Sequence, residues 1–123
     1  MAAATTPVTA PGILAPPDVV VGAAGGSVNL NVTLTAPGTS PVTVYYDTPA
    51  GTTSSRTACY GTSYGYVGQA GTLTFQPGVT SQTIRIPLLN CGQTVNGTFY
   101  LNLYSNSLDS TIARAQTTIT ETP

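Results

Sequence analysis

Two short alternating segments joined by Pro77-Gly78 constrain the fold of this chain more than any other feature. Apolar side chains recur there at every second position, namely Leu73 and Phe75 before the pair and Ile84, Ile86 and Leu88 after it. Successive side chains of a β-strand point to opposite faces, so each segment has one apolar and one polar face. Pro fixes φ and Gly tolerates positive φ, as a tight reversal requires. The run 66–89 therefore predicts a hairpin-like piece of an antiparallel sandwich.

The rest of the chain repeats this alternation between turn signals. The clearest further strand is 27–35, where apolar residues alternate with Ser, Asn and Thr. Other strands are expected at 19–21, 42–46, 99–103 and 112–119, and no segment has a capped helical period. About seven short strands predict an all-β fold, an immunoglobulin-like antiparallel β-sandwich. Its two sheets would bury a core of Val28, Leu30, Val32, Leu34, Val44, Leu73, Phe75, Ile84, Ile86, Phe99, Leu101 and Ile119.

The chain length predicts a single domain with a modest core. Residues 1–17 contain four prolines among Ala and Thr, which predicts an extended linker or a poorly paired edge segment. Residues 18–123 would then form the β-sandwich domain. The start has no signal-peptide pattern and both ends are linker-like, so we expect a piece of a longer secreted or surface protein.

Charge and residue types exclude several functions. The chain has three Arg, no Lys and no His, and a net charge of −1, so it offers almost nothing for a phosphate backbone to bind. No apolar run approaches the roughly 20 residues of a membrane-spanning helix. Without His or Lys, Ser-His-Asp and Lys-activated nucleophiles are excluded. The carboxylates are scattered in turns and ends, at Asp18, Asp47, Asp109 and Glu121. We expect no enzyme activity, no cofactor, no nucleic-acid binding and no membrane insertion.

Cys59 and Cys91 are the only two cysteines. In a neutral β protein with no His to complete a zinc site, they favour a disulfide over a metal. The alternative is a pair of unrelated buried thiols. A disulfide closing so long a loop would stabilise the fold by roughly 3–4 kcal/mol. It would also imply an oxidising, extracellular location.

Five segments together resemble a Calx-beta domain, in that domain's order and at about its spacing. They are 41–46, 48–52, 71–78 with its Gly-Thr-Leu-Thr-Phe sequence, 83–87 and 98–103. The resemblance covers about 18–121, and it implies an immunoglobulin-like sandwich. The family is named for calcium binding in sodium–calcium exchangers, and similar repeats occur in bacterial surface and secreted proteins.

This chain departs from the family at the acidic positions. It has Gly65-Tyr66 where the family usually has Asp-Tyr, and Val21-Gly22 where the family has Glu-Gly; residues 94–97 replace an acidic cluster. Glu121 alone remains at the end of the last strand, and Asp47 lies near an often acidic position. Calcium needs six to eight oxygen ligands, so we expect no metal. By the resemblance, Cys59 and Cys91 lie in loops that would carry ligands, and we hypothesise that their disulfide replaces the metal.

Three tyrosines, Tyr60, Tyr64 and Tyr66, lie in one Gly-rich loop. Exposed rings can stack on sugars or anchor a protein partner, which predicts a ligand-binding loop. The alternative is structural: Tyr66, with Tyr46 and Tyr100, would cap the core.

Two functions follow from these features. The first is a non-catalytic structural or adhesive module, a spacer or assembly subunit whose partners are neighbouring domains or subunits. The second is a carbohydrate-binding accessory module of a secreted enzyme, which would bind polysaccharide through the loop 60–66. Asn31 and Asn96 begin glycosylation sequons, which matter only in a eukaryotic secretory pathway.

Overall fold

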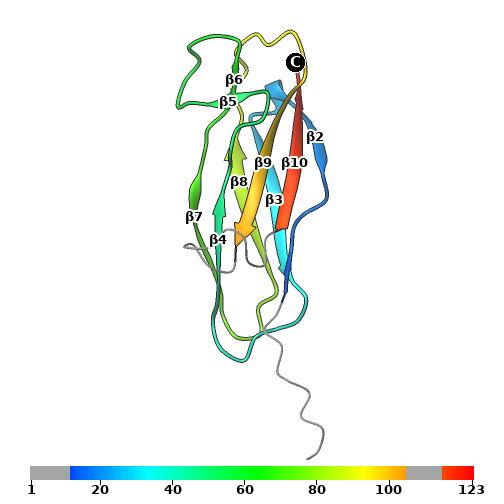
Figure 1. Ribbon diagram of the computed structural model, residues 1–123, viewed down its shortest axis with the longest axis vertical. Helices are drawn as coiled ribbons and strands as arrows, with labels where there is room; N and C mark the ends of the chain where they lie inside the picture. Colours follow the sequence, from blue (N-terminus) through cyan, green and yellow to red (C-terminus); the bar gives the residue numbers. More distant parts are fainter. Residues whose placement is uncertain (1–11, 105–114) are drawn as a thin grey trace, which may run out of the picture.

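The chain folds into two sheets packed face to face, with a small strand pair at one end (Figure 1). The computed structural model describes residues 12–104 and 115–123. One sheet has the order β1-β3-β8, with β1 Ile13–Leu14, β3 Ser27–Leu34 and β8 Ser81–Pro87. The other has the order β2-β10-β9-β4-β7, with β2 Val19–Gly22, β10 Ala115–Thr122, β9 Gly97–Tyr104, β4 Val42–Asp47 and β7 Ala70–Phe75. The pair is β5 Ser54–Ser55 with β6 Tyr64–Tyr66, and a 3-10 turn, η1, spans Ala23–Gly25.

This architecture confirms the predicted all-β, immunoglobulin-like sandwich. In the described part of the chain, the strands of four or more residues are β2, β3, β4, β7, β8, β9 and β10, the seven that were expected. Most pairs are antiparallel, as in β3–β8 and β9–β10. Two pairs are parallel, β2–β10 and β5–β6. No helix within the described ranges is long and apolar enough to cross a bilayer.

The predicted hairpin in the run 66–89 is wrong. β7 pairs with β4 in the five-stranded sheet, whereas β8 pairs with β3 in the three-stranded sheet. The reversal itself is present, because the Val79 amide donates to the Gln76 carbonyl over 2.9 Å and Gly78 has φ +86°. The turn therefore carries the chain from one sheet to the other. Both apolar faces still point into the same core, so the alternation alone fits either arrangement.

The core lies between the sheets and matches the predicted set closely. Every predicted core residue is buried except Leu73, which is half-buried. Tyr66, Leu88 and Leu103 complete the cluster.

The segment that precedes residue 18, which the sequence predicts as a linker or an edge segment, contacts both sheets in its described part. In residues 12–17, β1 pairs with the end of β3, with Ile13 opposite Leu34. The buried hydroxyl of Thr117 donates to the Pro16 carbonyl over 2.6 Å. The segment thus crosses from one sheet to the other and belongs to the sandwich, which agrees with the edge-segment interpretation. Residues 1–11, Asp109 and the predicted strand start at Ile112 lie outside the described residues.

Candidate functional site

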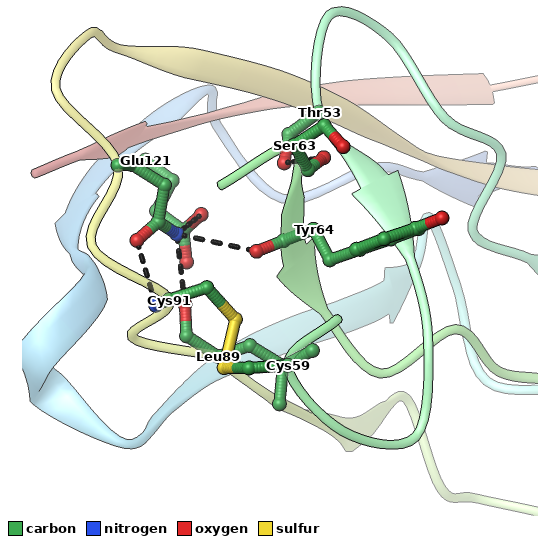
Figure 2. Close-up of a disulfide and its surroundings, with 8 residues drawn as sticks. Thr53, Cys59, Ser63, Tyr64, Leu89, Cys91 and Glu121 are labelled. Atoms are coloured by element: carbon green, nitrogen blue, oxygen red, sulfur yellow. Dashed lines mark hydrogen bonds between the residues drawn. A yellow bond between two sulfur atoms is a disulfide. The ribbon is translucent and has the colours of Figure 1, made fainter. Parts of the chain in front are cut away.

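A disulfide ties two loops together at one end of the sandwich (Figure 2). Cys59 lies between β5 and β6, and Cys91 lies between β8 and β9. Their sulfurs are bonded, and their Cα atoms are 5.4 Å apart. The predicted Cys59–Cys91 pairing is present, and the alternative of two unrelated thiols is not.

Glu121 is a buried carboxylate beside this disulfide (Figure 2). It lies near the end of β10 and is 2% exposed. Its Oε1 accepts a hydrogen bond from Gln93 Nε2 over 3.1 Å, and its Oε2 has no partner among the described residues. Burial raises the pKa of the carboxyl from 4.5 to about 7, while the Gln93 hydrogen bond acts in the opposite direction. The Glu121 carboxyl therefore gains or loses its proton near neutral pH.

The Gln93 side chain connects the disulfide loop to this carboxylate. Its Nε2 also donates to the Leu89 carbonyl over 2.8 Å and lies 3.5 Å from the Tyr64 carbonyl. Its Oε1 accepts from the Cys91 amide over 2.9 Å. Figure 2 shows these dashed bonds converging between Tyr64, Leu89, Cys91 and Glu121. One amide group thus joins β6, β10 and the β8–β9 loop.

Two glycines make room for this cluster. A Cβ at Gly65 would lie 2.1 Å from Glu121 Oε1 and 2.4 Å from Thr53 Oγ1. A Cβ at Gly97 would lie 2.7 Å from the Cβ of Thr53, a buried residue whose hydroxyl donates to the Ser63 carbonyl. The position where the resembling family carries an acid therefore has no side chain here. Its space is filled by a carboxylate from β10.

The donor set of this end does not fit calcium. Calcium takes six to eight oxygens, several of them from carboxylates. Here one carboxylate is present, and one of its oxygens already accepts an N–H bond from Gln93. The Gln93 amide directs N–H donors at the oxygens that a cation would need. In residues 12–104 and 115–123, no three His, Cys, Asp or Glu side chains gather as a metal site.

The three predicted binding tyrosines lie in different environments. Tyr60 is 66% exposed, and the Arg56 guanidinium lies 4.1 Å from its ring centroid and 5.5 Å from that of Tyr64. Tyr66 is fully buried and stacked on Phe99 with centroids 3.8 Å apart. The prediction of Tyr66 as a ligand-binding ring is wrong, because no ligand can reach it. A binding role for Tyr60 and Tyr64 stays a prediction.

Sequence reasoning found the cysteines and the isolated Glu121 but missed Gln93, Thr53 and Arg56. Gln93 and Thr53 carry no motif, and they meet Glu121 only because β10 brings the chain end between two distant loops. Arg56 is one of the three arginines of the chain, and no motif marks it. The available signal was Gly65, which lies where the resemblance leads one to expect an acidic side chain.

Comparisons with known proteins agree on the fold. No family model matches the chain, and no curated protein matches it in sequence. The apo form of the Calx CBD1 domain superposes with a TM-score of 0.69 at 23% identity, covering 92% of this chain and 98% of that domain. The Calx CBD2 domain gives 0.64 at 16% identity, covering 89% of this chain and 85% of that domain.

The calcium-binding domain CBD12 of CALX1.1 also matches, with a TM-score of 0.68 and 24% identity. The match covers 89% of this chain and 44% of that chain. This chain thus spans less than half the length of that solved structure. At these identities, the similarity establishes a Calx-beta type of sandwich and nothing finer.

Proposed function

We propose that this domain is a non-catalytic structural or adhesive module whose loop end is held by a disulfide instead of calcium. The observation that carries the proposal is the Cys59–Cys91 bond, which joins the β5–β6 and β8–β9 loops beside a single carboxylate. Such a module would act as a spacer or assembly subunit. Its partners would be the neighbouring domains or subunits of the same surface or secreted protein.

The disulfide also supports an extracellular location, since such bonds persist in oxidising compartments. Among the solved structures named above, CBD12 of CALX1.1 is described as a calcium-binding domain. This chain shares their fold but offers the buried Glu121 and an amide where a calcium site needs several carboxylates. We therefore propose that this domain serves as a scaffold whose structure does not depend on bound calcium.

Trypsin gives a direct test of the pairing. The chain has no Lys, so cleavage after Arg56 and Arg85 separates Cys59 from Cys91 into the peptides 57–85 and 86–114. Protein recovered from an oxidising compartment should give these peptides as one linked species that separates on reduction. Two free-thiol peptides in the unreduced digest would contradict the proposal.

A second candidate function is carbohydrate binding through the loop 56–64. It is favoured by the exposed Tyr60 ring and by Arg56, which contacts the rings of Tyr60 and Tyr64. A glycan array with Tyr64→Ala as the control would test it. Saturable binding that this change abolishes would favour the carbohydrate role over the spacer role.

A further inference from the structure

A cleft of about 450 Å³ lies next to the loop that carries Arg56. None of the residues around Glu121 lines this cleft. The end of β4 and residues 48–49 form one wall, residues 55–57 form a second, and residues 67–70 form a third. Only two of its lining residues are charged, Asp47 and Arg56. The residues that form the disulfide and the Gln93 hydrogen bonds do not line this cleft.

The walls of the cleft are held in place by hydrogen bonds, two of them partly buried and one buried. The Thr48 hydroxyl accepts from the Gln69 amide over 2.8 Å and donates to the Gln69 carbonyl over 3.1 Å. Beneath them, the buried Tyr66 hydroxyl donates to the Thr48 carbonyl over 2.7 Å. A ligand entering this cleft would therefore meet walls that are already ordered, which lowers the entropy cost of binding.

Arg56 and Asp47 are each held in place by contacts with tyrosines, and they do not form an ion pair with each other. The Arg56 guanidinium rests on the rings of Tyr60 and Tyr64, and it forms no ion pair with a carboxylate in the described part of the chain. A guanidinium stacked on aromatic rings keeps its N–H edge free for hydrogen bonds. The Asp47 carboxylate accepts one hydroxyl, that of Tyr104, at 3.1 and 3.2 Å, which leaves further acceptor positions.

These two groups select different parts of one ligand. A guanidinium binds a carboxylate through two parallel hydrogen bonds, and an aspartate accepts hydrogen bonds from hydroxyls. A small anion without hydroxyls would be repelled by Asp47, and a neutral sugar would leave Arg56 without a counter-charge. A uronic acid carries a carboxylate and several hydroxyls on one ring, and its apolar ring face can pack on an exposed tyrosine.

We propose that this cleft binds a uronic-acid-containing carbohydrate, with Arg56 holding the carboxylate and Asp47 accepting hydroxyl groups. The inference rests on the second candidate function above and names its ligand class. Tyr60, whose ring is exposed, would contact the sugar ring beside Arg56. Because the cleft is open and small, we expect weak affinity that multiplies when several copies bind one polysaccharide.

The test is a titration of the isotope-labelled chain with a galacturonic-acid trisaccharide, followed by amide chemical shifts. The expected result is saturable shifts confined to Tyr60 and the residues that line the cleft. Arg56→Gln and Asp47→Asn should each weaken binding at least tenfold. Arg85→Gln is the matched control, because it removes the same charge from an exposed residue of β8 that does not line the cleft. Arg56→Lys keeps the charge but loses the paired geometry, and should bind with intermediate affinity.

Each other outcome overturns a defined part of the proposal. Equal binding of the neutral galactose trisaccharide, unaffected by Arg56→Gln, would overturn the acidic ligand class and leave carbohydrate binding standing. Equal weakening by Arg85→Gln would show general charge attraction and overturn the site. Absence of saturable binding to both trisaccharides would overturn this inference, and if the glycan array also shows no binding, the second candidate function falls with it, while the disulfide-held module is untouched.

Discussion

At Gly65, the space that a side chain would fill is occupied by the Glu121 carboxylate. Gly65→Ala should therefore destabilise the domain by about 1–3 kcal/mol, the usual cost of forcing an extra methyl into packed structure. Gly25→Ala is the control, because a Cβ there would meet nothing within 4 Å. Urea unfolding of both variants measures the difference. Equal stability of the two variants would contradict the packing described around Glu121.

Glu121 gives a second prediction at this scale, through pH. Its folded pKa of about 7 lies above the ordinary 4.5, so the folded state holds this proton more tightly than the unfolded state. The resulting stabilisation is complete below about pH 4.5, falls as pH rises through 7 and is flat above that. The loss should be about 2–3 kcal/mol between pH 4.5 and pH 8.

Glu121→Gln should abolish this slope and make the chain more stable than wild type at pH 8. Urea unfolding at both pH values checks it, since the carboxylates shared by the two proteins cancel in the comparison. An unchanged slope in the variant would mean that Glu121 titrates normally.

Among single residues, the sequence predicted burial well and site chemistry poorly. Tyr66 was assigned both to a binding loop and to a core cap, because a ring in a Gly-rich segment fits either role. Only the stacking on Phe99 and the hydroxyl bond to Thr48 decide for the core. The Glu121–Gln93 contact joins positions 28 residues apart, which no local pattern reports.

Among the strands, the crossover between β7 and β8 depends on one turn. Gly78 has φ +86° and a Cβ there would meet no atom within 4 Å, so a substitution is strained only by the backbone. Gly78→Ala should cost about 1–2 kcal/mol, and Gly78→Asn less, because Asn tolerates this region better. Thermal unfolding of the two variants tests this order. If Ala and Asn were equally well tolerated, the positive φ would not be a requirement of the crossover.

The strands themselves were predictable because their alternation is local. Which strand pairs with which was not, and the run 66–89 shows why. Its two segments place apolar faces toward the same core whether they pair together or lie in opposite sheets. The choice depends on β3 and β4, which are the partners that β8 and β7 take. The small β5–β6 pair lies in residues 51–70, a segment without sustained alternation, so its pattern predicts an ordered loop with room for a short strand and does not give the pairing.

For the whole molecule, the central feature is a covalent bond that ties two loops together at one end of the sandwich. The disulfide spans 32 residues and links two loops on either side of β7 and β8. Closing a loop of this length removes unfolded-state entropy worth about 3–4 kcal/mol. At the same end, the Gln93 amide donates to the Glu121 carboxylate, and no three His, Cys, Asp or Glu side chains of the described residues gather as a metal site.

The most direct test is thermal unfolding of the oxidised chain with calcium, with a calcium chelator, and with a reductant. We expect the same Tm with calcium and with chelator, and a Tm lower by roughly 10–20 °C after reduction. The Cys59→Ser/Cys91→Ser variant, as the control, should unfold at the lower temperature with or without reductant. A Tm that rises with calcium and is unmoved by reduction would contradict the account.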